Sequence, residues 1–437
     1  MFTHYIDLAW RSLKRTPMVS ILMVCAIAIG IGITMTSLSV YHMMSMDPIP
    51  SKSDQLFAVQ LNTTDEGTDW WTEDNIALQL TYKDAMFLHN QESAFRKTAS
   101  MKGMATVHMN NDELKPYLAA TRVVGHQFFN MFELEFIYGG PWTIEQEQLA
   151  APVIVIDEET SEKHFGRPNS VGEQIYLDDR SYQIVGVTKN WDIHTKYYDL
   201  NNGAFSGVES IFLPITLIEA QQLDNSGNTN GWKFEEIDSF ESYLQSELVW
   251  LQFWVELPDQ RTKKDYESFL FAYLEEQGKL DRFERKTPEY KLRDVNEWME
   301  YNRVVSEDNK VLVGLSFLFL AVCLANILGL LLGKFLKRAP EVGVRRALGA
   351  NKRQIFLQHI IEVSMLGLLG GALGIVVAQI GLWGVRTTNQ EYNALASMDL
   401  SMLLAAPGIA ILACILAGLY PAWLVCRTQP AIYLKTQ

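Results

Sequence analysis

Residues of the types used in catalysis occur in this chain, but not at the spacing that catalysis requires. The phosphate-binding loop of an ATPase needs a glycine-rich turn followed by Lys and then Ser or Thr. The nearest match, Gly329 to Lys334, has the wrong spacing and is followed by Phe335. The 8 His residues are scattered singly, without the spacing of metal ligands, and no Ser lies in a Gly-x-Ser-x-Gly elbow. The sequence therefore predicts no catalytic residue and no metal site.

The most informative polar segment is a basic loop in the last third of the chain, which reads KRAPEVGVRRALGANKRQ. Pro340 suits the first position of a helix, and Glu341 favours its positive end. Gly349 suits the residue that ends such a helix. Asn351 and Gln354 have the spacing of an N-cap and the third residue of a following helix. The loop is thus predicted to form a short basic helix beside the membrane. It either contacts lipid headgroups or docks a cytoplasmic partner, and the residues alone leave both readings open.

Four apolar runs must position this loop. Each lacks Lys, Arg, Asp and Glu and is long enough to cross a bilayer, which takes about 20 residues as a helix. The predicted transmembrane helices are residues 17–46, 311–333, 363–385 and 400–426. The first run could instead be a cleaved signal peptide with Ala26-Ile27-Ala28 as its cleavage site. It continues well past that point, which favours a membrane anchor.

The distribution of Lys and Arg predicts the orientation. Basic residues gather in segment 1–16, a predicted amphipathic helix, in the loop 334–362 and in the tail 427–437. These regions should be cytoplasmic, while the short loop 386–399 and the long stretch 47–310 should be external. The net charge of -14 comes from the external stretch, which argues against a generally basic nucleic-acid binder. Its carboxylates predict a solvated acidic surface or, alternatively, an attraction for cationic ligands.

The external stretch combines strand and helix patterns, which is typical of an α+β domain. Strands are predicted at residues 55–61, 153–156, 174–177, 182–187, 248–257 and 290–294. Helices are predicted at 77–90 and behind a capping box at 262–265. A β-rich insert of about 117–219 should separate two β-α-β halves, and the two ends of the domain should meet.

Small residues let helices approach closely in lipid, and several recur at Gly-x-x-x-Gly spacing. The predicted packing glycines are Gly30, Gly329, Gly333, Gly367, Gly370, Gly371 and Gly374. Packing among the four helices of one chain and packing between subunits both remain open.

The loop motif EVGVRRALGA, from Glu341 to Ala350, resembles the E-[IV]-G-[IV]-R-[KR]-A-L-G-A signature of FtsX-like permeases. These are the membrane subunits of MacB-type (type VII) ABC transporters. The similarity continues through LGLLGGALG, from Leu366 to Gly374, and GLYPA, from Gly418 to Ala422. Short pairs in the external stretch, such as Val124-Gly125, resemble the MacB-like periplasmic domain. The chain departs from the family at Ala339-Pro340, where a charged residue usually precedes the Glu.

The resemblance implies an integral membrane protein with four transmembrane α-helices. A large α+β periplasmic domain, MacB-like, would lie between the first and second helices. Segment 340–350 would be the coupling helix that docks into a separate ABC ATPase. Its implied contact residues are Pro340, Glu341, Val344, Arg345, Arg346, Leu348, Gly349 and Ala350.

The same resemblance implies the partners and the location. ATP and Mg²⁺ would bind on the partner ATPase and no cofactor on this chain, since no ATPase domain is expected at either end. A second permease would complete a homodimer or a related heterodimer. Membrane lipid would be a further partner, and nucleic acid would not. A periplasmic adaptor (membrane fusion protein) and an outer-membrane channel could join the complex. The complex would lie in the bacterial inner membrane, with both termini cytoplasmic.

The function that the resemblance implies is mechanotransmission. Motion of the ATPase would be transmitted across the membrane to the periplasmic domain, and no substrate would pass through a channel. The size of the external domain favours efflux of a hydrophobic or peptide-like substrate, such as an antimicrobial of the macrolide type. Lipoprotein release, and FtsX-like regulation of a cell-wall hydrolase, are the alternatives. A two-component sensor is disfavoured because two further membrane helices leave no room for a kinase.

Overall fold

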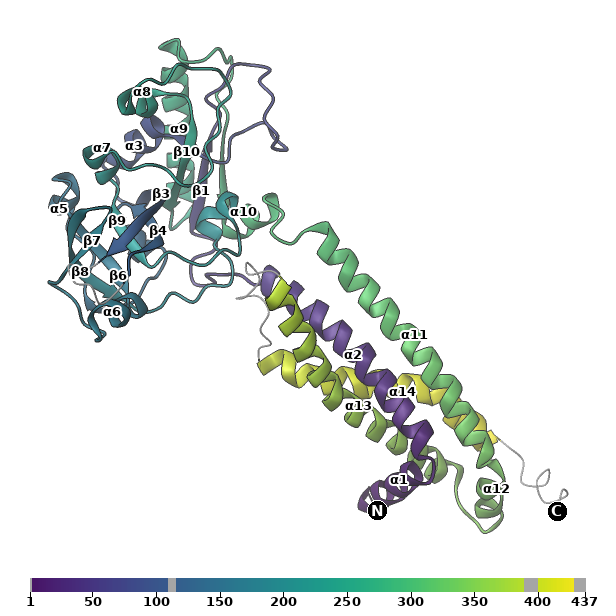
Figure 1. The fold of residues 1–437 in the computed structure, drawn as a ribbon. Helices are drawn as coiled ribbons and strands as arrows, with labels where there is room; N and C mark the ends of the chain where they lie inside the picture. Colours follow the sequence, from purple (N-terminus) through teal and green to yellow (C-terminus); the bar gives the residue numbers. More distant parts are fainter. Residues whose placement is uncertain (1, 109–114, 389–399, 428–437) are drawn as a thin grey trace. The chain divides into compact units, whose positions relative to one another are not determined.

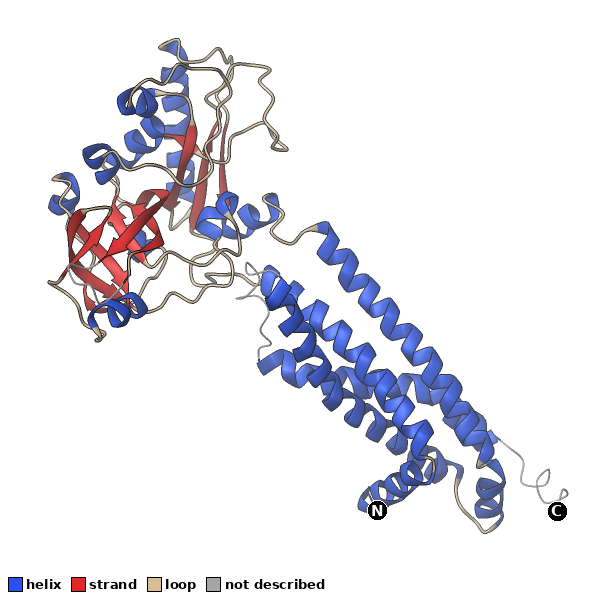
Figure 2. Ribbon diagram, viewed as in Figure 1, coloured by secondary structure: helices blue, strands red, loops and turns tan. Residues whose placement is uncertain are grey.

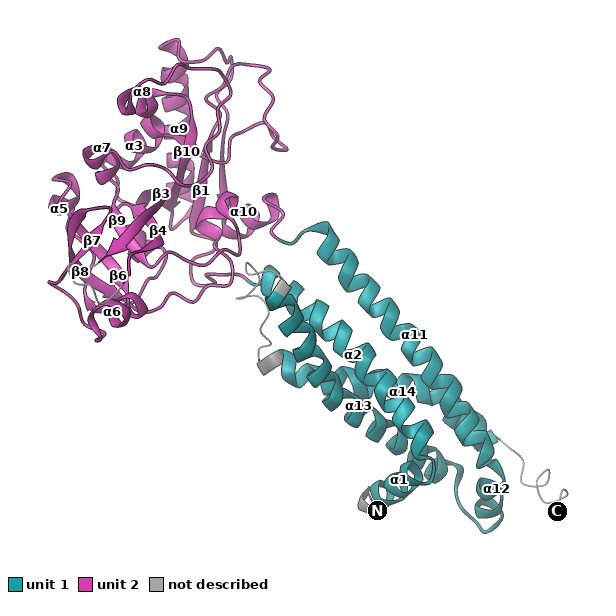
Figure 3. Ribbon diagram, viewed as in Figure 1, with its two compact units in different colours: residues 1–46, 305–437 teal, residues 47–304 magenta. Residues whose placement is uncertain are grey.

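The structure is a computed structural model that describes residues 2–108, 115–388 and 400–427. The chain forms two compact units (Figure 3). Unit 1 combines residues 1–46 with 305–437, and unit 2 is the continuous segment 47–304. The boundary after Val304 precedes the predicted end of the external domain at residue 310. Most of the predicted loop 386–399 and tail 427–437 lies outside the described residues.

Unit 1 is helical (Figure 1). Its helices are α1 (Phe2–Arg15), α2 (Pro17–Ser45), α11 (Glu307–Lys337), α12 (Ala339–Ala347), α13 (Lys352–Thr388) and α14 (Leu400–Arg427). Helices α2, α11, α13 and α14 are long and apolar enough to cross a membrane, which confirms the four predicted spans. Both α11 and α13 extend beyond the predicted spans, because the flanking charged residues continue the helices instead of ending them.

Helix α2 packs against α11 and α13, and α14 packs against α13 and α11. The side chains of Met23, Ile27 and Ile31 on α2 are buried in this bundle. Thr34 adds a polar contact, since its Oγ1 donates to the Gly30 carbonyl oxygen at 2.8 Å and lies 3.1 Å from the Ser316 carbonyl oxygen on α11. Such contacts between helices are typical of membrane bundles, where water exclusion alone does not hold helices together.

Unit 2 is built on one twisted sheet (Figure 2). Its strands are β1 (Leu56–Leu61), β2 (Leu80–Thr81), β3 (Lys97–His108), β4 (Tyr117–Val124), β5 (Phe136–Gly139), β6 (Val153–Asp157), β7 (Gln174–Leu177), β8 (Arg180–Thr188), β9 (Ile211–Pro214), β10 (Val249–Glu256) and β11 (Tyr290–Asp294). The strand order is β11-β1-β10-β3-β4-β9-β6-β8-β5, with β2 beside β10 and β7 beside β3 and β8. The first and last strands pair, as predicted for a domain whose two ends meet.

Helices cover both faces of this sheet. They are α3 (Tyr82–Asn90), α4 (Phe128–Met131), α5 (Ile144–Gln148), α6 (Glu158–Phe165), the 3-10 helix η1 (Tyr197–Asn202), α7 (Leu217–Gln221), α8 (Phe240–Gln245), α9 (Gln260–Lys279) and α10 (Val295–Tyr301). One core packs α3, α8 and α9 against side chains such as Val59 and Trp250. The other core lies on the opposite face of the sheet. It packs α4, α10 and η1 against strand side chains such as Ala58 and Trp254.

All six predicted strands are present with small shifts of their bounds, but two helix predictions need correction. The segment 77–90 is not one helix, since Leu80 and Thr81 pair with β10 before α3 begins. Thr81 caps α3 by accepting the backbone N–H of Asp84 at 3.2 Å. Helix α9 begins earlier than the predicted capping box, because Asp259 is its N-cap and accepts the N–H of Thr262 at 2.8 Å.

The predicted β-rich insert is part of a closed ring that includes β3, a strand that the sequence did not predict. Strand β3 pairs with β4, β4 with β9, β9 with β6, β6 with β8, β8 with β7, and β7 with β3 again. Burial alternates along β3 only after Met101, and one face carries Ala99, Met101, Gly103, Ala105 and Val107. Val107 is the single β-branched residue of this set, whereas several β-branched residues usually indicate a strand.

Candidate functional site

The predicted coupling segment forms α12, between α11 and α13. Pro340 occupies the second helical position, one later than predicted. Gly349 has a φ of 99° and follows the last turn, so glycine is the favoured residue there. The N–H groups of Gly349 and Ala350 donate to the carbonyl oxygens of Arg346 and Arg345 at 3.1 and 3.0 Å. This pair of hydrogen bonds forms a Schellman motif. Gly349 therefore ends the helix, as the sequence predicted.

The start of α13 also follows the prediction. The N–H of Asn351 donates to Gln354 Oε1 at 3.3 Å, and Asn351 Oδ1 accepts the N–H of Arg353 at 3.2 Å. The turn between α12 and α13 is therefore closed by side-chain caps on one side and by Gly349 on the other.

The two faces of α12 differ. Ala339, Val342 and Gly343 are buried against the rest of unit 1. The opposite face leaves apolar side chains free, with Val344 49% and Leu348 83% exposed. Pro340 is also exposed, and the spacing of four residues aligns the three on one stripe. An exposed apolar stripe on a short helix with a defined C-terminal end is a surface suited to docking.

The charged residues of α12 frame this stripe. Glu341 and Arg345 form an i,i+4 pair at 2.5 Å, with both side chains more than 40% exposed. A pair this exposed contributes about 0.3–0.5 kcal/mol at most, so it orients the side chains more than it stabilises the helix. Arg346 Nη1 donates to the carbonyl oxygen of Cys426 at 3.3 Å, which links α12 to the end of α14.

A buried charge cluster anchors the base of α12. The carboxylate of Glu362, fully buried on α13, accepts from Ser12 Oγ and lies 2.7 Å from Lys334 Nζ on α11. Arg338, at the start of α12, lies 3.8 Å from the same carboxylate and donates to both the side chain and the carbonyl oxygen of Ser12. His359 completes the cluster at 3.9 Å. Four helices thus meet at one carboxylate, which we call the Glu362 anchor.

No contact between Lys334 and Glu362 was predicted from the sequence. A signal was available, because the first directly follows one predicted span and the second directly precedes the next. Consecutive antiparallel helices place those two positions at the same depth. The pairing therefore could have been predicted from topology.

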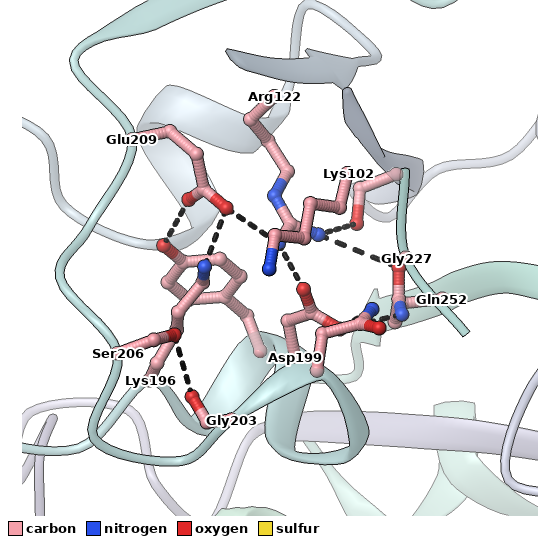
Figure 4. Close-up of polar contacts among 12 residues, drawn as sticks. Lys102, Arg122, Lys196, Asp199, Gly203, Ser206, Glu209, Gly227 and Gln252 are labelled. Atoms are coloured by element: carbon pink, nitrogen blue, oxygen red, sulfur yellow. Dashed lines mark hydrogen bonds and ion pairs between the residues drawn. The ribbon is translucent and has the colours of Figure 1, made fainter. Parts of the chain in front are cut away.

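Unit 2 contains a second buried charge cluster, centred on Arg122 of β4 (Figure 4). Arg122 Nη2 bonds Asp199 in η1 and Glu209 Oε1, the latter at 2.8 Å. Glu209 also receives Lys196 Nζ at 2.5 Å and the hydroxyl of Tyr198 at 2.8 Å. Arg122, Asp199 and Glu209 have no exposed side-chain surface. The cluster fastens the segment 195–209 to the sheet.

The pKa values follow from burial and from these partners. Burial alone would raise the pKa of Glu209, but Arg122 and then Lys196 lower it to about 2. The pKa of Lys196 is also lowered, because burial and the neighbouring Arg122 disfavour its charged form more than Glu209 favours it. The arrangement is a structural ion network.

Potential metal ligands do not converge in the described parts of the chain, where no three His, Cys, Asp or Glu side chains are placed to hold an ion. The nearest approach is around Glu147, which lies 3.1 Å from His89 and 3.3 Å from His126. Burial would raise the pKa of Glu147, but hydrogen bonds from His126 and His89 lower it to about 2.

Comparison with known families agrees with this architecture. The sequence model of the MacB-like periplasmic core domain matches residues 20–267, which is more than half of the chain. The sequence model of the FtsX-like permease C-terminal region matches residues 313–430. The chain belongs to the MacB/FtsX-like permeases. It is accordingly an ABC-transporter permease and a multi-pass membrane protein, with the MacB-like domain between its first two membrane helices.

Individual relatives are distant. The permease is 22% identical over 371 residues to the macrolide export ATP-binding/permease protein MacB of Haemophilus ducreyi, covering 84% of this chain and 47% of that protein. It is 23% identical over 449 residues to MacB of Photorhabdus laumondii, covering 98% and 60%. The chain spans about half the length of the curated relatives it matches. The periplasmic region of MacB from Actinobacillus actinomycetemcomitans aligns at 14% identity with a TM-score of 0.37, covering 57% of this chain and 94% of that one.

Five of the seven predicted packing glycines of this permease lie at helix contacts. They are Gly30 against α11, Gly370 and Gly374 against α2, and Gly367 and Gly371 against α14. Added Cβ atoms at Gly329 and Gly333 would meet open space within the described chain. These two glycines of α11 therefore do not pack against the other helices of the bundle. Their spacing alone had left packing within one chain as one of two possibilities.

This difference makes a testable pair. A Cβ at Gly371 would lie 2.9 Å from both Ala410 Cβ and Pro407 Cα on α14, so Gly371→Ala should destabilise unit 1 by about 1–3 kcal/mol through overpacking. Gly333→Ala should be neutral or slightly stabilising, since Ala favours helix. Thermal unfolding of the two variants in lipid nanodiscs measures the difference. Equal unfolding temperatures would contradict the contact between α13 and α14.

Proposed function

We propose that this chain is the permease subunit of an ATP-driven MacB-type exporter of the bacterial inner membrane, with both termini cytoplasmic. The stripe of Pro340, Val344 and Leu348 carries the proposal, because a short helix that ends in a Schellman motif and is apolar outward fits a groove of a separate ABC ATPase. That partner would bind and hydrolyse ATP with Mg²⁺, and a second permease would complete the dimer.

The Glu362 anchor supports the proposed transmission of motion. Arg338 begins α12 and bonds Ser12 on α1, while Glu362 on α13 holds Lys334 on α11. A displacement of the docked α12 would therefore move three other helices together, and through them the external unit. The driven substrate would be hydrophobic or peptide-like, and an adaptor with an outer-membrane channel would receive it.

The decisive experiment disrupts the stripe. Burying a Leu side chain contributes about 1.5–3 kcal/mol, and each 1.4 kcal/mol is about tenfold in affinity. Leu348→Asp should therefore reduce co-purification of the ATPase by at least about tenfold. Tagged protein would be isolated from its native host in mild detergent, and each co-purifying chain identified and quantified by mass spectrometry.

The matched control is Leu149→Asp in unit 2, because Leu149 is 81% exposed and Leu348 is 83% exposed. Equal recovery of the ATPase with Leu348→Asp and the unchanged chain would refute docking through α12. Recovery of a periplasmic adaptor would support export. Recovery of a lipoprotein carrier or a hydrolase activator instead would reassign the complex to lipoprotein release or to regulation.

A further inference from the structure

Strands β3, β4, β9, β6, β8 and β7 of unit 2 close into a six-stranded barrel, and in a barrel alternate side chains face the interior. The registers identify these positions. Met101, Gly103 and Ala105 of β3 lie opposite Val123, Thr121 and Ala119 of β4. Most of these side chains are small, and Thr121 occupies the space beside Gly103, where an added Cβ would lie 2.6 Å from Thr121 Oγ1.

The wall of the barrel also has a gap at β3. One edge of β3 pairs with β10 only at 97–100 and with β7 only at 107–108. Between these points the loop after α7 passes the strand, and the N–H of Ser226 donates to the Lys102 carbonyl oxygen at 3.0 Å. Closer to β7, the N–H of Asp178 donates to the Thr106 carbonyl oxygen at 3.0 Å and its Oδ1 accepts the Thr106 N–H at 2.7 Å, so the gap is confined to the residues around Met104.

A cavity of about 250 Å³ lies at this gap. Its floor is formed by interior side chains that include Met101, Val123, Leu177, Tyr182 and Leu213, each at most 3% exposed. Typical ligand pockets measure about 300–1,000 Å³ and are largely apolar with a few polar groups. This cavity is therefore sized for the apolar body of a small molecule.

The rim of the cavity is charged. Asp178, Arg180 and Asp224 line it, and Asp224 also borders an adjoining hollow with Asp238. Arg180 Nη1 already donates to the Gln221 carbonyl oxygen at 2.8 Å, and Asp178 Oδ1 accepts the N–H of Thr106 at 2.7 Å. Both Asp178 and Asp224 are exposed. The acidic surface of the external stretch adds a negative potential that favours cations.

We propose that the gap in the barrel is a binding site for a small cationic amphiphile. The apolar body enters between β3 and the loop after α7, and its cationic group lies at Asp224 and Asp178. The site belongs wholly to unit 2 and does not depend on docking of α12. A test of this site is therefore independent of a test of the proposed function.

The test is photo-crosslinking of the full chain in lipid nanodiscs with a benzophenone that carries an alkylamine. A benzophenone of the same length that carries a carboxylate is the matched probe, and labelled residues are mapped by mass spectrometry. Met101 and Met104 both line the cavity. We expect the amine probe to label their peptide at least about fivefold more than the carboxylate probe, as a charge contact of about 1 kcal/mol gives.

Two variants decide the outcome. Ala105→Phe fills the cavity and should abolish labelling, whereas Leu118→Phe, on the outer face of β4 where Leu118 is 63% exposed, should retain it. Asp224→Lys changes only the rim and should remove the preference for the amine, which keeps the test valid if Ala105→Phe does not fold. Labelling confined to the membrane helices, or an unchanged probe preference in Asp224→Lys, would overturn the proposal.

Discussion

Glu362→Leu should destabilise unit 1 by about 3–5 kcal/mol, the usual cost of removing one partner of a buried ion pair. Lys334 is 1% exposed and Arg338 18% exposed at this carboxylate. Without it, Lys334 would keep a buried charge that has lost its counter-ion, and Ser12 would lose its acceptor. Thermal unfolding of the purified chain in lipid nanodiscs, followed by circular dichroism, measures the effect.

The double variant Glu362→Leu with Lys334→Met is the control. It replaces both charges by apolar side chains of similar volume, which is often neutral or stabilising. We therefore expect it to recover most of the stability that the single variant loses. A double variant no more stable than Glu362→Leu would show that the charge pairing is not the cause.

Arg122→Met should destabilise unit 2 by a similar amount, about 3–5 kcal/mol. The substitution leaves Asp199 and Glu209 buried with Lys196 as their nearest remaining cation. The segment 195–209 should loosen first, because its carboxylates and hydroxyl bond to this network. Hydrogen exchange would show faster exchange in η1, and thermal unfolding would give the total loss.

The same network predicts a pH dependence. The pKa of Glu209 is lowered from 4.5 to about 2, so its contribution to stability is fully present above about pH 4.5 and is lost as the pH falls toward 2. Arg122→Met removes the largest cause of that lowering. Its unfolding temperature should therefore fall less than that of the unchanged chain across this pH range, and equal slopes would contradict the assignment.

Local sequence signals predicted those parts of the fold that local interactions determine. The end of α12 at Gly349 and the caps around Asn351 depend on a few neighbouring residues, and both were predicted. The strands at 153–156 and 248–257 were predicted because their apolar runs have the length of a buried strand. The membrane spans were predicted because exclusion of charge from lipid is a property of each segment alone.

The features that sequence reasoning missed depend on contacts between distant segments. Arg122 reads as an ordinary exposed cation until η1 and Glu209 fold over it. Strand β3 has weak β propensity and is stabilised by three neighbouring strands. Gly329 and Gly333 have the same spacing as the packing glycines, and only the rotation of α11 about its own axis distinguishes them.

Strand β3 has a mechanical consequence. Its first residues are bonded to β10 in the open part of the sheet, and its later residues to β4 and β7 in the barrel. The two parts of unit 2 therefore share one continuous stretch of backbone, and turning one against the other would require breaking ladder hydrogen bonds. Strand β3 runs from one part to the other without a break or hinge. We therefore expect a pull applied where the chain enters the sheet, through β1 and β11, to be transmitted to the barrel through β3.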